Sequence, residues 1–597
     1  MTSRSDLQGT HPMRNQAELE SLVESCVTQA ESLLSSLSAL DWLGYGTELK
    51  YSDIPSLPRL RDFLSAALAI TRTIENAGCA IHRLPTEILA KVFGYLPQDA
   101  LAGHTFHRTD FPNTDHHSVQ DYAALQQVCR HWRQILTPLP SYWTTIVLQK
   151  GSWTTSDKFI EFYLAKSVPQ PIDVIAETFS GLAIVAQHSS RLRSLQIQHN
   201  EKWTSMIDDA FGSLCHGAPI LESFNCHIQA PNADEELDIS ESKLPLVFAG
   251  DTPSLRKLRL HGFTSWHGNQ FDHLTHICIH GWSSSNTISN GFQELLSLIS
   301  HNPAVEEIYF SVLDPWIPED WDDTLLETTH LTHLRRLSLS NSTVSQYIAL
   351  ISHLHIPAHA SISLNNTIAR PEDGNIVSLL RDPFKFDNLT NVKSLVTRFA
   401  CNVIAFGPSG SLQINTAYDY GDRFLRYSNL DEWFFAENLR EVWLNSPTED
   451  SPQTDWFAFF AALPSLRKLS LQAVVTKPLI RALSRQSSPP RFSTARTLCR
   501  SLQTLWIIED YDMMPNWLNS SYYDLLQCAE MRYANGVPFQ ELKIQSAIRP
   551  ADGWPGSMVD ALRQYAMLVD MDAQDLAVDI PEELNENLHS DYWPKWC

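Results

Sequence analysis

The sequence feature that most constrains the fold is a recurring six-residue pattern, LxxLxL, in which each L stands for leucine or another large apolar residue. Clear copies begin at Leu192, Leu221, Leu255, Leu274, Val305, Leu334, Leu439, Leu466, Leu502 and Phe539. A degenerate copy covers residues 360–364 and a weak one covers residues 392–396. The alternation at the end of each copy places its fourth and sixth side chains on one face of a short strand.

The copies are mostly separated by about 25–37 residues, a period typical of leucine-rich repeats. Helical patterns lie between them, for example Gln293 to Ser300 and Asp455 to Leu463. In such a repeat the strand buries its leucines against the next unit, and the helix covers the outside. We therefore expect an α/β fold in which residues 157–568 form an irregular leucine-rich-repeat solenoid. An ordinary α/β domain with parallel strands fits the same strand–helix alternation.

The residues between the leucines are expected to point out of the concave face of the solenoid, because side chains alternate along a strand. By this alternation seven residues are expected to be displayed there: Lys257, Arg259, Tyr309, Arg336, Trp443, Lys468 and Trp506. Exposed aromatic and arginine side chains are typical anchors of protein interfaces. The sequence predicts that this row binds a protein partner; the alternative is that these residues pack under a loop or a terminal cap.

Two amphipathic segments precede the repeats. In the first, Leu84, Ile88, Leu89, Val92, Phe93 and Leu96 recur at helical spacing after Pro85. The second, residues 125–136, carries a similar stripe that includes Val128, Cys129 and Trp132 and is followed by Pro140-Ser141-Tyr142-Trp143. Two short amphipathic helices cannot bury their stripes alone, so we expect them to pack on each other and on a further surface.

The run "LPxEIL…VF…L", followed by "VCRxWR" and "PxxW", resembles an F-box, the helical module of substrate receptors in SCF-type cullin–RING ubiquitin ligases. With its helical N-terminus and leucine-rich C-terminal part, the chain also resembles the F-box-like proteins that are abundant in mushroom-forming fungi. The resemblance assigns residues 81–148 to the F-box. It implies that ten residues dock on the Skp adaptor or support that docking: Leu84, Pro85, Ile88, Leu89, Val92, Phe93, Leu96, Val128, Cys129 and Trp132.

The chain departs from the F-box pattern in the connection between the two segments, which is much shorter in a compact F-box. Here residues 97–122 form an insertion that contains His104, His107, His116 and His117. Histidine is a zinc ligand, but no cysteine pair or typical ligand spacing accompanies these four. We therefore expect a polar loop and no metal. The alternative to a working F-box is a leucine-rich-repeat scaffold whose degenerate F-box has no ligase role.

The two ends of the chain carry weaker signals. Residues 1–15 are polar and expected to be disordered, and residues 16–80 are expected to form amphipathic helices. Leu19, Cys26, Leu33 and Leu40 recur every seven residues, which fits either self-association or a helix folded back on a second one over residues 57–74. Residues 569–597 form an acidic tail, which either binds basic surfaces or remains solvated.

Composition excludes several functions. The net charge of −24 argues against binding to nucleic acid or an anionic membrane. The 10 cysteines form no CxxC pair, and the N-terminus has no apolar signal segment, so an intracellular location in cytoplasm or nucleus is expected. The most apolar short run, residues 64–70, is too short to span a bilayer.

The search for catalytic motifs also points away from enzymatic activity. The chain has no GxxxxGK[ST] loop, no GxGxxG after a strand and no HExxH. The glycine spacing in Gly407-Pro408-Ser409-Gly410 is wrong for a nucleophile elbow. We therefore expect a non-enzymatic chain without cofactors, which binds the Skp adaptor of a cullin-based ligase and an unknown protein substrate.

Overall fold

The structure is a computed structural model that divides into two compact units, Met1–Pro85 and Thr86–Cys597. Besides scattered positions between 21 and 35, it describes residues 57–103, 125–148, 156–199, 205–228, 243–263, 265–281, 291–311, 328–367, 387–398, 402–408, 410–416, 435–445, 455–472, 476–484, 498–509, 517–546 and 556–570. The unit boundary falls inside the predicted F-box, so residues 81–85 belong to the first unit.

The first unit is helical where it is described. Helix α2, Leu57–Gly78, contains the helix predicted over residues 57–74, and the 3₁₀ helix Ala80–Arg83 follows it. Described positions between 21 and 35 are also helical. The predicted disordered stretch 1–15 and the heptad residues Leu19, Cys26, Leu33 and Leu40 lie outside the described residues, as do the acidic tail beyond residue 570 and residues 104–122 of the insertion.

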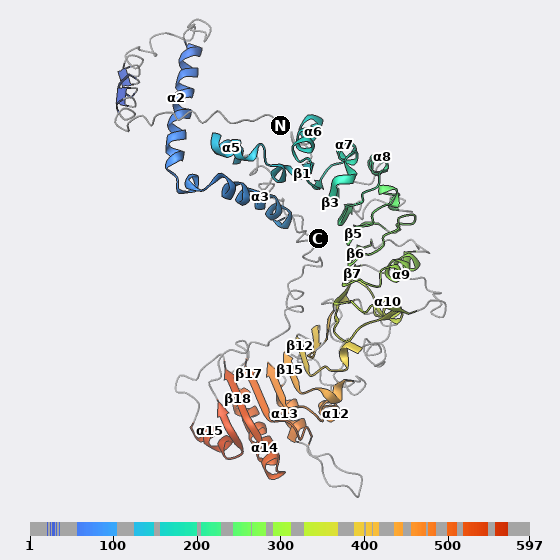
Figure 1. Cartoon of the computed structure of the whole chain (residues 1–597). Helices are drawn as coiled ribbons and strands as arrows, with labels where there is room; N and C mark the ends of the chain where they lie inside the picture. The colour runs from blue at the N-terminus through green and yellow to red at the C-terminus, as the bar shows by residue number, and fades with distance from the viewer. Residues whose placement is uncertain are drawn as a thin grey trace, which may run out of the picture. The chain divides into compact units, whose positions relative to one another are not determined.

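The second unit contains the remaining helices and a 17-stranded sheet. Its helices are α3 Thr86–Gly103, α5 Arg130–Leu136, α6 Asp157–Lys166, α7 Leu182–Ala186, α8 Ser205–Ser213, α9 Gly291–His301, α10 Val344–Ser352, α12 Trp456–Ala461, α13 Thr476–Ser484, α14 Trp517–Ala534 and α15 Gly556–Arg563. Several of these helices lie beside the strands that neighbour them in sequence (Figure 1). No helix among the described residues is long and apolar enough to cross a bilayer.

The strands of the large sheet follow one another along the chain. They are β1 Thr145–Leu148, β2 Ile172–Ala176, β3 Leu192–His199, β4 Ser223–Ile228, β5 Lys257–His261, β6 His276–His280, β7 Glu307–Ser311, β9 Arg336–Ser340, β11 Ser361–Thr367, β12 Ser394–Arg398, β13 Asn402–Phe406, β14 Ser411–Thr416, β15 Glu441–Asn445, β16 Lys468–Gln472, β17 Thr504–Glu509, β18 Phe539–Ser546 and β19 Ala566–Asp570. A separate parallel pair joins β8 Thr329–His330 to β10 Leu354–His355.

The mixed α/β class predicted from the sequence is confirmed, because the sheet is mostly parallel and helices alternate with its strands. Every clear LxxLxL copy ends in a strand, and in most copies the strand begins at the third residue. The copies pair in phase: Lys257 lies opposite His276, which lies opposite Glu307, which lies opposite Arg336. The repeated spacing of apolar residues therefore becomes continuous rows across the sheet.

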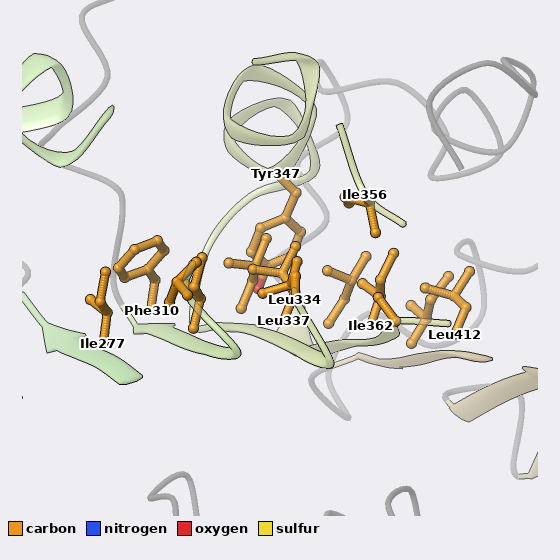
Figure 2. Packing of buried hydrophobic residues seen from close by; sticks show 14 of the residues in the cluster. Ile277, Phe310, Leu334, Leu337, Tyr347, Ile356, Ile362 and Leu412 are labelled. Carbon is orange, nitrogen blue, oxygen red and sulfur yellow. The ribbon is translucent and has the colours of Figure 1, made fainter. Parts of the chain in front are cut away.

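The apolar row forms the core on one face of the sheet. Figure 2 shows Ile277, Phe310, Leu337, Ile362 and Leu412 in line on five successive strands, with Tyr347 of α10 packed against them. Each of these side chains is at most 2% exposed. Their burial is the main stabilising contribution that the repeated pattern makes, because each buried large apolar side chain contributes about 1.5–3 kcal/mol.

Buried asparagines add a second connection between neighbouring strand–helix units. Asn302 accepts from the backbone N–H of Leu274 at 2.7 Å and donates to the carbonyls of Phe271 and Leu298, both at 2.8 Å. Asn388 likewise donates to the carbonyls of Ala360 and Ser411, both at 3.1 Å. These side chains satisfy buried backbone groups that the strands leave unpaired.

The sequence did not predict the local reversal in the middle of the sheet. Strand β11 pairs with β14, and β13 lies antiparallel between β14 and β12 before the parallel order resumes at β15. Gly407 and Gly410 bound the turn from β13 to β14, where the Gly407 N–H donates to the Gly410 carbonyl at 3.0 Å. A Cβ on Gly410 would lie 2.6 Å from the backbone oxygens of Ala358 and Asn388, so a glycine allows these segments to approach closely.

Candidate functional site

Helices α3 and α5 pack face to face, despite the insertion between them, and we call them the helical pair. Leu89 and Phe93 of α3 and Ile135 and Leu136 of α5 are at most 6% exposed. The rings of Phe93 and Trp132 lie 4.9 Å apart, centroid to centroid. The structure therefore brings together the two amphipathic segments that the sequence analysis singled out.

Local hydrogen bonds define where α5 begins and what it packs on. Cys129 precedes the helix in an extended conformation, and its Sγ accepts from the backbone N–H of Trp132 at 3.4 Å. Arg133 Nε donates to the Gln126 carbonyl at 2.9 Å, which ties α5 to the helical turn 125–128. Beyond α5, the Trp143 indole N–H donates to the Leu136 carbonyl at 3.2 Å. Cys129 thus caps a helix, which is the structural role that its position offers.

The outer side of the helical pair exposes apolar side chains. Ile88, Val92 and Tyr95 follow one another along α3 at helical spacing and are 46%, 44% and 53% exposed. We call these three the docking stripe; Val128, just before α5, is also 46% exposed. Neighbouring exposed apolar residues make this side of α3 a candidate surface for contact with another molecule. Tyr95 was missed in the sequence, although it lies seven residues after Ile88 and extends the same stripe.

The ten predicted adaptor-binding residues therefore have different positions. Ile88, Val92 and Val128 are exposed; Leu89 and Phe93 are buried; Cys129 and Trp132 are half-buried. Leu84 and Pro85 are exposed in the first unit, and α3 begins one residue later. Leu96 belongs to α3, but its side chain lies outside the described residues. Only the exposed members are placed to contact a partner directly.

The seven residues predicted for the concave row share the sheet face opposite the hydrophobic core, which we call the second face. They alternate along their strands with core residues such as Leu258 and Leu260 of β5. Their expected exposure is wrong for four of them: Arg259, Tyr309, Trp443 and Trp506 are only 2–8% exposed. Lys257, Arg336 and Lys468 are half-buried. Strands lie about 4.8 Å apart, so large side chains in adjacent rows cover one another.

In the first half of the second face, three histidines stack on neighbouring strands. His227, His261 and His280 occupy equivalent positions on β4, β5 and β6, with ring centroids 4.0 and 4.3 Å apart. Burial, followed by the nearby charge of Arg259, lowers the pKa of His227 to about 3 and that of His280 to about 4. We call these three the histidine ladder. The sequence signal for it was a histidine directly after three LxxLxL copies.

Next to this ladder, Tyr309 and Arg336 hold each other on β7 and β9. Arg336 donates to the Tyr309 hydroxyl at 2.9 Å and lies 4.0 Å from a carboxylate oxygen of Glu307. Burial raises the pKa of Tyr309, so the phenol keeps its proton. These two predicted partner-binding residues therefore have contacts within the protein, which fixes their orientation on the second face.

In the second half of the second face, tryptophans and lysines gather. The indoles of Trp443 and Trp506 lie 6.2 Å apart, on strands β15 and β17. Lys468 Nζ lies 4.8 Å from the centroid of the Trp443 ring, and Lys543 Nζ lies 5.0 Å from that of Trp506. Three of the residues predicted from sequence meet here, and Lys543 joins them because β18 continues the same row.

Within the described part of the chain, no three His, Cys, Asp or Glu side chains form a cluster able to hold a metal ion. No protein-family model matches the chain, and no curated protein matches it either.

Proposed function

We propose that this chain is a substrate receptor of an SCF-type cullin–RING ubiquitin ligase. The helical pair binds the Skp adaptor, and the second face, as the concave side of an irregular leucine-rich-repeat solenoid, binds the target protein. The chain acts without catalytic residues or cofactors, in the cytoplasm or nucleus. Its contribution is proximity: it raises the effective concentration of the target near the transfer site that the other subunits supply.

The observation that carries the proposal is the division of α3 into two sides. Leu89 and Phe93 anchor the helix to α5, which leaves Ile88, Val92 and Tyr95 exposed along the opposite side. Exposing three large apolar side chains in a row is unfavourable for a chain that works alone, and their burial in a complex is a source of affinity. The likeness of "LPxEIL" and "VCRxWR" to an F-box supports the Skp adaptor as the partner.

The solenoid part of the proposal rests on the in-phase pairing of successive copies. Equivalent residues of neighbouring copies lie side by side on β4 to β9 and again on β15 to β18. The asparagine bonds from one strand–helix unit to the preceding one support the same architecture. Stacked units of this kind present one continuous binding face.

Co-purification with a Skp adaptor tests the proposal. The full chain is co-expressed with the adaptor and captured, and the double variant Ile88→Asp with Val92→Asp is compared with Tyr523→Asp, which changes a side chain that is 70% exposed on α14. We expect the double variant to lose the adaptor and Tyr523→Asp to retain it. If the double variant retains the adaptor, the docking assignment is wrong. A chain that captures a target but no adaptor at all would be a scaffold.

A further inference from the structure

The inference concerns five residues of the second face that we call the tryptophan–lysine site: Trp443, Lys468, Ser470, Trp506 and Lys543. Trp443, Ser470 and Trp506 lie directly opposite one another on β15, β16 and β17, and Lys543 continues the row on β18. Because Ser470 is small, the two indoles approach to 6.2 Å across it. The row thus offers two aromatic rings with a hydroxyl between them.

Two polar atoms at the centre of this site form no hydrogen bond with any other described residue. The Trp506 Nε1 and the Ser470 Oγ are buried and have no hydrogen-bond partner there. Trp506 is 8% exposed and Ser470 is 2% exposed. Buried polar groups are normally satisfied, so this indole N–H and the hydroxyl beside it are free for a molecule from outside the described residues, such as water or a ligand.

The two lysines cover the indole rings and give the site its positive charge. Each ammonium lies over one indole, at 4.8 Å for Lys468 and 5.0 Å for Lys543, so the lysine stems account for part of the burial of the rings. Lys543 also pairs with Glu541 at 2.8 Å, whereas Lys468 has no carboxylate within ion-pair distance among the described residues. A cation over an aromatic ring is held less strongly than one that donates to a carboxylate. An arriving carboxylate therefore draws the ammonium aside and uncovers the indole.

We propose that the tryptophan–lysine site binds an extended, acidic, proline-containing segment of a partner protein. The carboxylates pair with Lys468 and Lys543, a backbone carbonyl accepts from Trp506 Nε1, and a proline ring stacks on the uncovered indole. Proline segments suit aromatic-lined surfaces because they are extended before they bind. The inference rests on the proposed role of the second face and names the kind of segment that it selects.

The direct test is fluorescence anisotropy with a labelled decapeptide of alternating glutamate and proline, added to the purified full chain. The same peptide with glutamine in place of glutamate is the uncharged control. We expect the acidic peptide to bind and the control to bind at least tenfold more weakly, which is the loss expected for one charge-assisted contact, about 1.4 kcal/mol. Equal binding of the two peptides, or no binding of either, overturns the proposal.

Variants then locate the site. Lys468→Gln should weaken binding about tenfold. Lys166→Gln, which also removes an ammonium from above an aromatic ring but on α6, should leave it unchanged. Trp506→Phe removes the indole N–H but keeps a ring, and should weaken binding severalfold. Glu541→Gln removes the carboxylate that competes for Lys543 and should strengthen binding, a gain that misfolding cannot produce. If Lys166→Gln weakens binding as much as Lys468→Gln, the site is misplaced.

The outcomes distinguish this inference from the proposed ligase function. They also distinguish a partner segment from the chain's own acidic segment as the occupant of the site. The Ile88→Asp, Val92→Asp chain should bind the peptide normally, because no adaptor takes part in the assay. Adaptor capture without peptide binding overturns the inference alone, and peptide binding without adaptor capture overturns the ligase proposal alone. Binding that appears only after removal of residues 571–597 would identify that acidic segment as the occupant and overturn the assignment to a partner.

Discussion

Phe93 and Trp132 contact each other with ring centroids 4.9 Å apart and planes inclined by 59°. This contact closes the helical pair across an insertion, and it separates residues that hold the pair together from residues on its outer side. Phe93 is 2% exposed, whereas Val92 beside it in the chain is 44% exposed. Adjacent positions on one helix therefore differ: Phe93 belongs to the core, and Val92 belongs to the exposed side that we propose binds the adaptor.

This division predicts a large and a small loss of stability for two neighbouring substitutions. Phe93→Ala should destabilise the helical pair by about 3–5 kcal/mol, because it removes a buried aromatic ring. Val92→Ala should change stability by less than about 0.5 kcal/mol, because its side chain is already half in water. Hydrogen exchange of the α5 amides measures both effects. If Val92→Ala raised the exchange rates as much as Phe93→Ala, the exposed side of α3 would be part of the core.

The sequence predicts the α/β class and the strand positions well because both follow from periodicity. A leucine placed by alternation, such as Leu258 or Leu337, is buried whichever unit it belongs to. The sequence does not predict strand pairing or side-chain burial where these depend on residues that are distant in the chain. The reversal at β13 depends on which strand β11 pairs with, and the burial of Trp443 depends on Lys468 from the next strand. No local pattern encodes either contact.

The histidine ladder predicts a loss of stability in mild acid. Burial lowers the pKa of His227 to about 3 and that of His280 to about 4, from a usual value of 6.5, and lowers the pKa of His261 as well. Below pH 6.5 the unfolded chain therefore binds more protons than the folded chain. The contribution of these histidines to the free energy of unfolding is full above that pH and is lost as the pH falls toward the lowered pKa values. Between pH 7 and pH 5 the loss is about 2 kcal/mol for each fully shifted histidine.

Urea unfolding at pH 7, 6 and 5 measures this loss. The window ends at pH 5 because carboxylates begin to titrate below it. The matched variant is His227→Gln with His280→Gln, which keeps polar side chains of similar size but removes two titrating groups. Its unfolding midpoint should fall less between pH 7 and pH 5 than that of the unchanged chain. If the unfolding midpoints of the variant and of the unchanged chain fall equally between pH 7 and pH 5, the ladder has no role in acid sensitivity.

Arg532 of α14 has a buried guanidinium that holds a neighbouring segment in place. It is 0% exposed, and its guanidinium donates to the carbonyls of Leu498, Cys499 and Leu502 at 3.0–3.2 Å while lying over the Phe539 ring. Arg532→Lys keeps the charge, but a lysine ammonium lacks the planar guanidinium that reaches all three carbonyls. We therefore expect the free energy of unfolding to fall by about 2–4 kcal/mol.

Hydrogen exchange in residues 498–509 is the readout for Arg532, because the segment before β17 depends on these bonds. Arg563→Lys is the control: Arg563 forms an exposed pair with Asp560 at 3.6 Å, and its substitution should change stability by less than about 0.5 kcal/mol. A small effect of Arg532→Lys on this segment would mean that the three carbonyls are satisfied in another way.

Asn302 offers a test of the proposed solenoid itself. Its side chain bonds to Leu274, Phe271 and Leu298, so Asn302→Ala leaves buried backbone groups unpaired and should cost about 2–4 kcal/mol. In a stack of units, each unit contacts mainly its neighbours, so the damage should remain local. Exchange should rise in β6 and β7 while β16 to β18 stay protected. Asn535→Ala, an exposed change on the turn after α14, should affect neither region. A uniform rise across all strands would instead indicate a single cooperative domain, and the solenoid proposal would fail.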